Sequence, residues 1–225
     1  MILVITLFIF FSIVGLGVLF LKLNYFVSST NRLNSNKVLL SFDDGPEPST
    51  TPQVLDILKK HEVGALFFTI GEKVQANKAL TERINEEGHL IGNHSNTHNN
   101  ILALYSTRSL INDLRQAENE LDKIIKDRPK LFRPPIGYTN PNFSRALKRL
   151  ELKCVGWRLR SFDTLFKSSY KLSKHLIKSV RSGDIVLLHD NLDVTLNALS
   201  DFIIQAKKNG IVFVSRQEVK NIFDD

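Results

Sequence analysis

The sequence contains almost no cysteine, since Cys154 is the only one among 225 residues. A single thiol cannot form a disulfide within the chain, so a disulfide-stapled scaffold is excluded, as is a zinc site built from several thiolates. Any bound metal must therefore be held by histidine, aspartate or glutamate. Internal repeats and low-complexity tracts are also missing, and the 43% hydrophobic and 24% charged residues are typical of a globular chain.

Acidic residues are outnumbered, because 23 Asp and Glu face 30 Lys and Arg, which gives a net charge of +7. Such an excess can indicate binding to nucleic acid or to an anionic membrane. The basic residues are scattered, however, without a dense run and without the interleaved aromatics of a base-stacking surface. We therefore expect no nucleic-acid partner, and no obligate protein partner is evident.

The start of the chain is predicted to be a membrane anchor. Residues 1–21 contain no charged side chain and consist mostly of Ile, Leu, Val and Phe, and about 20 apolar residues suffice to cross a bilayer as a helix. A cleaved signal peptide would need a basic start and a small-residue cleavage site, which are not evident here. The sequence favours an uncleaved single-pass anchor over residues 1–27, followed by a polar linker over 28–36.

The charges near this segment bear on its orientation. Lys22, Arg32 and Lys37 all follow the apolar stretch, and cytoplasmic flanks usually carry the excess of Lys and Arg. Flanking charge therefore argues for a cytoplasmic domain. The functional expectation developed below argues for an extracytoplasmic one.

From residue 37 to residue 225, short apolar runs alternate with longer amphipathic stretches, which predicts alternating strands and helices. Thr51 and Pro52 are expected to open one helix as its cap and first residue, and Leu110–Ile125 is expected to form the longest. This order is typical of a mostly parallel α/β sheet or barrel, whose functional residues gather at the C-terminal ends of strands. The predicted strands are 38–42, 65–70, 90–92, 130–132, 153–157, 184–189 and 211–215.

Two polar groups at predicted strand ends suggest a metal site. Asp43 and Asp44 precede a Gly-Pro turn, and alone they could simply form that turn. His94 and His98 are four residues apart, so on a helical turn both imidazoles would project to one side. One carboxylate and two imidazoles with an open position make a catalytic zinc site. Three further histidines are expected to be structural or exposed: His61, His89 and His175.

Further polar residues follow other predicted strands. Arg133 precedes Pro134 and Pro135, His189 ends an apolar run, and Asp163 follows the strand that contains Trp157. Each has a purely structural alternative, such as a surface salt bridge or a helix cap. Their joint occurrence at successive strand ends favours one shared site.

These five groups, in this order, resemble the motifs of the polysaccharide deacetylases, the NodB-homology or family 4 carbohydrate esterases. The motifs are Ser41–Pro46, His94–His98, Arg133–Gly137, Trp157–Asp163 and Leu187–Asp190, and the resemblance covers nearly everything after the linker. It implies a distorted, incomplete (β/α)7 barrel. It also implies a metal-dependent hydrolase that removes N-acetyl groups from peptidoglycan, chito-oligosaccharide or exopolysaccharide.

The resemblance also implies roles for single residues. A divalent metal would be held by Asp44, His94 and His98. Zinc is the default metal, although cobalt, nickel, manganese or iron can occupy such ligands. Asp43 would be the general base and His189 the general acid.

Further positions would support these groups. Arg133 would hold Asp43 in place and keep it ionised, and Asp163 would orient His189. The residues expected to contact substrate are Pro134, Pro135, Ile136, Trp157 and Leu187.

The sequence departs from the family pattern without losing a ligand, the base or the acid. Ile136 stands where an aromatic usually follows the double proline, Asn99 replaces a proline, and Thr164 replaces a tryptophan. Two alternatives stay open. A cytoplasmic domain would suit deacetylation or deformylation of a lipid-linked sugar, and the missing aromatics would suit a non-catalytic, membrane-tethered carbohydrate-binding module.

Overall fold

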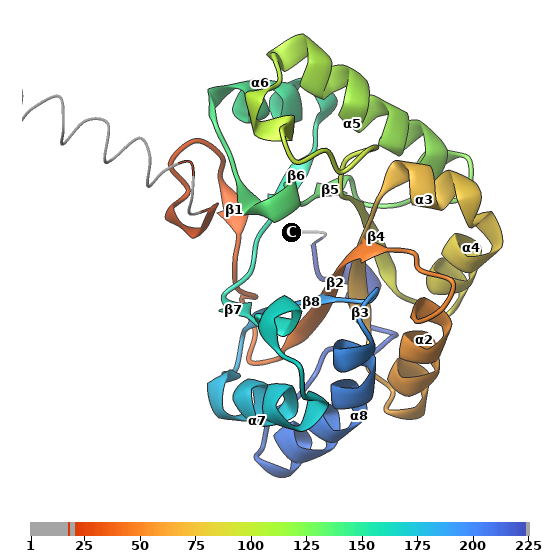
Figure 1. Ribbon diagram of the computed structural model, residues 1–225, viewed down its shortest axis with the longest axis vertical. Helices are drawn as coiled ribbons and strands as arrows, with labels where there is room; N and C mark the ends of the chain where they lie inside the picture. Colours follow the sequence, from red (N-terminus) through yellow and green to blue (C-terminus); the bar gives the residue numbers. More distant parts are fainter. Residues whose placement is uncertain (1–17, 19–20, 224–225) are drawn as a thin grey trace, which may run out of the picture.

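The computed structural model describes residues 18 and 21–223, and within them one curled sheet of eight strands forms the centre of the molecule (Figure 1). The strand order is β1-β6-β5-β4-β3-β2-β8-β7, and every neighbouring pair is parallel. The strands are β1 (Ser29–Thr30), β2 (Leu39–Gly45), β3 (Ala65–Thr69), β4 (Leu90–Asn93), β5 (Leu131–Phe132), β6 (Lys153–Val155), β7 (Leu159–Arg160) and β8 (Ile185–His189).

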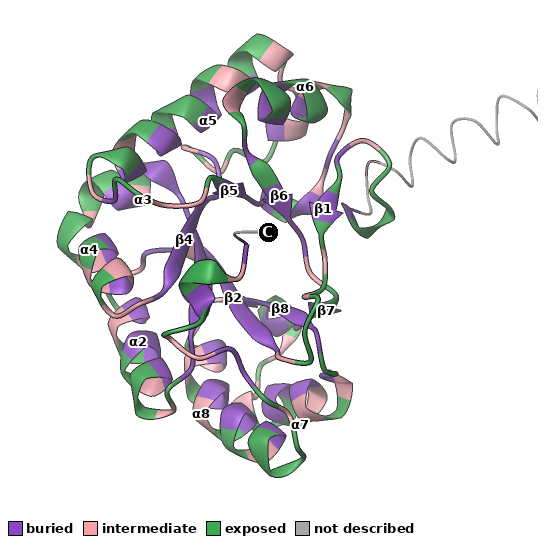
Figure 2. Cartoon of the chain, turned by 180° about the vertical axis from the view of Figure 1, so that it is seen from behind, coloured by how far each residue is buried: buried purple, intermediate pink, exposed green. Residues whose placement is uncertain are grey.

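Helices surround the outside of this sheet and bury one face each against it (Figures 1 and 2). The α-helices are α2 (Thr51–Lys60), α3 (Gly71–Ala76), α4 (Lys78–Glu86), α5 (Thr107–Asp122), α6 (Pro141–Leu150), α7 (Ser169–Ser179) and α8 (Asp193–Lys208). Short 3₁₀ turns are η1 (Leu21–Leu23), η2 (Leu102–Leu104), η3 (Pro135–Gly137), η4 (Asp163–Leu165) and η5 (Val219–Asn221).

The sheet is apolar on both faces because both are covered. Along β2, Leu40 and Phe42 pack in the layer shared with the helices, whereas Leu39 packs in a second cluster. That second cluster includes Val219 and Phe223 from the C-terminal segment, which enters the ring of strands (Figure 1). Burial on both faces explains why the central strands are continuous apolar runs without alternation.

The sheet does not close on itself within the described chain. Its edges are β1 and β7, and no ladder joins them. The predicted fold class, an α/β incomplete barrel, is confirmed. The C-terminal ends of β2, β4, β5 and β8 meet at one rim, and this rim carries the polar residues that the sequence placed at strand ends.

Several predicted boundaries differ from the structure. The stretch 211–215 is not a strand: Phe213 and Ser215 make only isolated bridges, to Val38 and Val63. The predicted strand 153–157 ends at residue 155, and β1 and β7 were not predicted. Thr50, and not Thr51, occupies the N-cap position of α2, and its side chain makes no capping hydrogen bond.

The range 28–36, predicted as a linker, contributes to the sheet. Ser29–Thr30 form β1 beside β6, and Arg32 bridges to Asp184. Ordered structure of the domain thus begins before residue 37. These contacts fix the chain along the open edge of the barrel.

Most of the predicted anchor over residues 1–27 lies outside the described residues. In the described part of the chain, no helix is long and apolar enough to span a membrane. Leu21 and Val27, at the end of that range, are 4% and 6% exposed and belong to a cluster with Phe132 and Phe143. The last residues of the range therefore pack against the domain.

Candidate active site

Two consecutive carboxylates leave the end of β2 in different directions. The pairing with β3 shifts register between Asp43 and Gly45, and Asp44 between them has a φ of 73°. This left-handed conformation is uncommon outside glycine, although aspartate tolerates it better than most residues. As a result, Asp43 faces Arg133 while Asp44 faces the two histidines.

Asp44, His94 and His98 form a cluster with metal-binding geometry. One ligand atom from each lies within 4.8 Å of the others, and Asp44 Oδ1 is 3.5 Å from His94 Nε2 and 3.2 Å from His98 Nε2. His94 Nδ1 lies 2.8 Å from the Arg133 carbonyl, which fixes the donating nitrogen and leaves Nε2 as an acceptor. Asp44 Oδ1 is buried without a hydrogen bond of regular geometry. These features fit a divalent cation held by three protein ligands.

The electrostatics of the cluster agree with that fit. Burial alone would raise the pKa of Asp44, but the His94 and His98 imidazoles outweigh it and hold this pKa well below its usual range. The same Asp44 carboxylate raises the pKa of His98, against the opposing effect of burial. The carboxylate is therefore ionised at neutral pH, as a metal ligand must be.

The histidines come from an irregular loop, so the expected helical turn is wrong. Ser95 and His98 have positive φ values of 68° and 49°. The loop is fixed from outside by α5: the Asn96 amide donates to Asp113 at 2.9 Å, and the Thr97 hydroxyl donates to Asp113 at 3.0 Å. The convergence of the two imidazoles depends on these tertiary contacts rather than on helical spacing.

A second carboxylate of α5 braces the residue just before His94. Asn93 donates to Glu118 at 2.8 Å, and its side-chain oxygen accepts from the Ser95 amide at 2.8 Å. Sequence reasoning missed both Asp113 and Glu118. The available signal was that these acidic residues flank apolar positions on the buried face of a predicted helix, where an unpaired carboxylate would be costly.

Arg133 holds Asp43 in a buried ion pair. Its guanidinium is 0% exposed and donates to Asp43 at 2.7 Å and to Ser41 at 2.9 Å. It also donates to the carbonyls of Val155 and Gly156, at 3.1 and 2.7 Å. Burial lowers the pKa of Arg133, and Asp43 opposes that change. With four hydrogen bonds fixing it, the guanidinium leaves Asp43 little freedom to turn.

His189, at the end of β8, is oriented by Asp163. His189 Nδ1 lies 2.8 Å from Asp163 Oδ1, and Asp163 Oδ2 accepts from the His189 amide and from Thr195, each at 2.8 Å. Burial lowers the pKa of His189, but Asp163, with help from Asp43 and Asp44, raises it to about 9. His189 is therefore protonated at neutral pH, and its Nε2 is available to the pocket.

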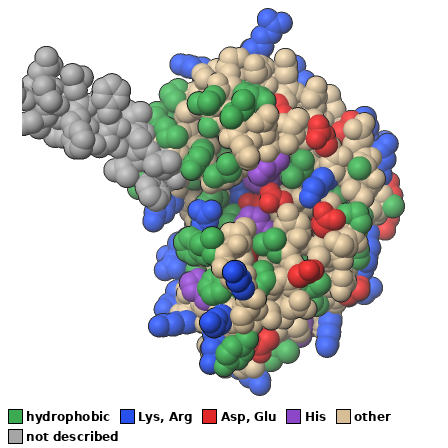
Figure 3. Space-filling view, viewed as in Figure 1, with side chains coloured by type: hydrophobic (Ala, Val, Ile, Leu, Met, Phe, Trp, Pro, Cys, Tyr) green, Lys and Arg blue, Asp and Glu red, His purple; other side chains and the backbone are tan. Residues whose placement is uncertain are grey.

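One pocket of about 180 Å³ is lined by the expected metal ligands, base and acid: Asp44, His94, His98, Asp43 and His189. Arg133 and Asp163 lie behind Asp43 and His189 and do not line it. Figure 3 shows histidine and acidic side chains gathered in a hollow near the middle of this face. Of the expected substrate-contacting residues, Ile136, Trp157 and Leu187 line the pocket, whereas Pro134 and Pro135 are buried and do not.

The chain beside the pocket is tightly packed. Ile136 has a φ of 63°, unusual for a β-branched residue, and is 42% exposed. A Cβ on the following Gly137 would come within 2.6 Å of the Trp157 ring. Glycine is thus required at 137, and Trp157 forms the floor under this turn.

Three histidines that were expected to be structural or exposed lie outside the metal cluster: His61, His89 and His175. His61 contacts Ser200 at 2.9 Å, and His175 contacts the rings of Phe162 and Phe166. His89 accepts from a backbone amide, and burial lowers its pKa to about 3. These contacts agree with structural roles.

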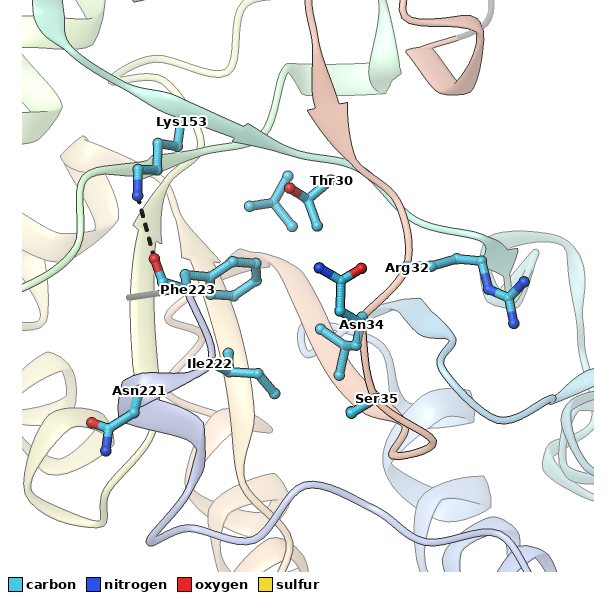
Figure 4. Close-up of a pocket in the computed structure, with 10 residues that line it drawn as sticks. Thr30, Arg32, Asn34, Ser35, Lys153, Asn221, Ile222 and Phe223 are labelled. Atoms are coloured by element: carbon cyan, nitrogen blue, oxygen red, sulfur yellow. Dashed lines mark hydrogen bonds between the residues drawn. The ribbon is translucent and has the colours of Figure 1, made fainter. Parts of the chain in front are cut away.

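A separate cavity of about 500 Å³ lies between β1, β6 and the C-terminal segment (Figure 4). Lys153 Nζ donates to the Phe223 carbonyl at its edge, at 3.3 Å. No histidine, cysteine or carboxylate side chain is among the described residues that line it. It lacks the chemistry of a catalytic site.

The comparisons with known proteins agree with the site. Residues 30–155 match the family model described as polysaccharide deacetylase. The chain belongs to the polysaccharide deacetylase family. This confirms the expected enzyme class, a hydrolase that removes N-acetyl groups from polysaccharide by cleaving amide carbon–nitrogen bonds, and agrees with metal dependence.

Individual relatives are similar over most of the chain. A peptidoglycan-N-acetylglucosamine deacetylase of Bacillus cereus is 37% identical over 83% of this chain and 89% of that protein. The peptidoglycan-N-acetylmuramic acid deacetylase PdaA of Bacillus subtilis is 35% identical over 79% of this chain and 69% of its own length. A solved structure of B. subtilis PdaA, a family 4 carbohydrate esterase, gives a TM-score of 0.76 at 32% identity, covering 88% and 86% of the two chains.

The contacts of α5 with the histidine loop generate a prediction. Asp113→Ala removes both acceptors that fix residues 96 and 97, so His98 should lose its placement and zinc affinity should fall about 10- to 100-fold. Competition with a chromophoric zinc chelator measures this affinity on the purified full-length chain.

Gln116→Ala is the matched control. Gln116 lies on the same helix and accepts from the exposed side-chain amide of Asn96 at 3.3 Å. This variant should bind zinc as the parent does. Unchanged affinity in a folded Asp113→Ala variant would show that α5 does not support the site.

Proposed function

We propose that the chain removes N-acetyl groups from the glycan strands of peptidoglycan. The observation that carries this proposal is the joint placement, in one pocket, of the Asp44–His94–His98 cluster, an Asp43 held by arginine and a His189 paired with Asp163. The polymer itself is suggested by the B. cereus and B. subtilis relatives, whose names give peptidoglycan as their substrate.

We propose Zn²⁺ as the metal, held by the Asp44 carboxylate and by Nε2 of His94 and His98. Two imidazoles and one carboxylate with an open position are the donor set of catalytic zinc, although cobalt, nickel, manganese and iron accept the same ligands. A bound divalent cation supplies Lewis acidity, which lowers the pKa of water and polarises the acetyl carbonyl.

In this proposal Asp43 accepts the proton of the attacking water. The Asp43 Oδ2 atom is 3.9 Å from His94 Nε2, whereas Asp44 Oδ1 is 3.5 Å from the same nitrogen. Asp43 therefore lies beside the cluster, and Asp44 is the carboxylate nearer to His94. The other oxygen of Asp43 is held by Arg133. The ion pair orients the free oxygen toward the pocket, and this geometry is what a general base requires.

His189 donates a proton from Nε2 to the amine that leaves the sugar. An amine anion is a very poor leaving group, so proton donation is needed for the carbon–nitrogen bond to break. Asp163 fixes the donor through Nδ1. Base and acid are thus separate residues on neighbouring strands, in register at Asp43 and His189.

The substrate acetyl group is placed in the pocket by apolar and backbone groups. Leu187 and Trp157 line the pocket and give an apolar surface for the methyl group. We propose that the backbone amide near Ile136 stabilises the developing oxyanion. Pro134 and Pro135 act indirectly, by restricting the backbone that leads to this turn.

Acetate release from purified peptidoglycan tests the function. The full-length chain in neutral detergent, supplied with zinc, should release acetate, and His189→Ala should lower kcat about 10²- to 10⁴-fold because the leaving amine loses its proton donor. Activity should disappear with a chelator and return with zinc. If peptidoglycan yields no acetate while neutral chito-oligosaccharides do, the proposed substrate is wrong.

The pH profile tests the role of His189. Its raised pKa of about 9 means that the proton donor is present below that pH and is lost as pH rises through it. Part of the rise comes from Asp43 and Asp44, and a bound cation would offset that part, so kcat/KM should fall at or somewhat below pH 9. Asp163→Asn removes the larger contribution and should move this alkaline limb to lower pH.

Asp193→Asn is the control for that profile. Asp193 is exposed at the start of α8, the helix that also carries Thr195. Its profile should match the parent. An alkaline limb at the same pH in the Asp163→Asn variant would contradict the assignment of His189 as the acid.

We also propose that the apolar part of residues 1–27, ahead of the residues that pack against the domain from Leu21 onward, anchors the domain on the outer side of the cytoplasmic membrane. The absence of charge over residues 1–21 supports an anchor, and a peptidoglycan substrate supports an extracytoplasmic domain. Lys37 forms an ion pair with Glu218, and Arg32 donates to the Ser182 carbonyl at 2.8 Å. Lys37 and Arg32 therefore have structural partners in the domain. Their positive charges can be explained by these contacts and do not require that the domain lie in the cytoplasm.

Protease treatment of intact bacterial cells stripped of their wall tests this orientation. The domain should be digested from outside while a cytoplasmic marker survives. Digestion only after lysis would place the domain in the cytoplasm and would favour a lipid-linked sugar as substrate.

A further inference from the structure

A second groove of about 400 Å³ opens beside the catalytic pocket. The two share Ile136, Trp157 and Arg160 in their linings, so they are continuous at the rim of the barrel. No carboxylate side chain is among the described residues that line the second groove. In Figure 3, basic and hydrophobic side chains lie beside the central hollow, toward the β1 and β7 edges of the sheet. The groove is therefore a positively charged extension of the site.

Arg160 lies where the two hollows join and has no acidic partner within 4 Å among the described residues. It is the last residue of β7 and is exposed. Arg158, two residues earlier, is different, because its guanidinium is 3.3 Å from Asp184. One arginine of the groove is thus neutralised by the protein, while the other presents its charge to whatever occupies the groove.

Phe162 supports the Arg160 guanidinium on the side of the groove. The guanidinium carbon lies 5.4 Å from the centre of the Phe162 ring, a cation–π contact. Phe162 has a φ of 55° and the residue is 45% exposed. A bulky residue in this conformation costs energy and persists only where the surrounding structure enforces it. Here the following residue, Asp163, is fixed by His189 and Thr195.

From this arrangement we propose that the groove binds a carboxylate on the glycan next to the reacting sugar, with Arg160 as the specificity-determining residue. A guanidinium recognises a carboxylate through two parallel hydrogen bonds, and a partly enclosed groove strengthens them. Trp157 and Phe162 give flat apolar surfaces for the sugar rings. The inference rests on the proposed function, and it specifies the chemical group that the site recognises on the peptidoglycan glycan, a carboxylate beside the reacting sugar.

The carboxylate can come from two parts of such a glycan. It can belong to the lactyl ether of a neighbouring sugar or to a peptide attached there, and both present the same chemistry to Arg160. Neutral chito-oligosaccharides carry neither group. A comparison of matched fragments therefore separates the requirement for a carboxylate from its source.

The test measures KM for three tetrasaccharide substrates with the zinc-loaded, full-length chain. They are a peptide-free peptidoglycan fragment with free lactyl carboxylates, the same fragment with those groups converted to amides, and a peptide-bearing fragment. The parent should have a KM about tenfold lower for one or both acidic fragments than for the amidated one. Arg160→Gln should remove this difference in KM between the acidic and amidated fragments, and Arg160→Lys should restore part of it.

Arg149→Gln, which removes an exposed arginine of α6, controls for net charge and should keep the preference. Equal KM values for the acidic and amidated fragments in the parent would overturn the proposal. So would an Arg160→Gln variant in which KM rises equally for both fragments.

Binding of the same fragments to the Asp43→Asn variant separates this inference from the enzymatic function. Calorimetry reports affinity there without turnover. Tighter binding of the acidic fragment that disappears in the Asp43→Asn, Arg160→Gln double variant would support the groove even if no substrate released acetate. Acetate release without any Arg160-dependent affinity would support the deacetylase function and contradict carboxylate binding in the groove.

Discussion

The buried guanidinium of Arg133 is the interaction on which the site depends. It joins β2 to β6 by donating to Ser41 and Asp43 on one side and to the carbonyls of Val155 and Gly156 on the other. Its own carbonyl accepts from His94 Nδ1. One residue thereby orients both the carboxylate assigned as base and an imidazole of the metal cluster, and leaving either partner unpaired in this buried position would be costly.

Around that ion pair, the protein separates charges that would otherwise interfere. Asp43 and Asp44 are adjacent in sequence, yet the left-handed backbone at Asp44 directs them to different partners. Across the pocket, Asp163 keeps His189 protonated. Asp43 and His189 thus each face a buried partner that can carry the opposite charge, Arg133 for Asp43 and Asp163 for His189.

Sequence reasoning found the α/β architecture and the strand-end residues, because apolar runs and polar strand ends are local patterns. It could not find what depends on tertiary contact. The convergence of His94 and His98 was ascribed to a helical turn, whereas it comes from a loop fixed by Asp113 on α5. Likewise, the short strands β1 and β7 form only because segments distant in sequence meet there. Each has only two residues, which is too short for a periodic pattern of apolar residues to predict a strand.

The most direct test of this account is to measure zinc content and acetate release together in two variants. Asp43→Asn should bind about one equivalent of zinc, as the parent does, and release almost no acetate, because the base is lost while the ligands remain. His94→Ala should lose both. Equal zinc in the parent and His94→Ala, or full activity in Asp43→Asn, would contradict the division of the two aspartates between catalysis and metal binding.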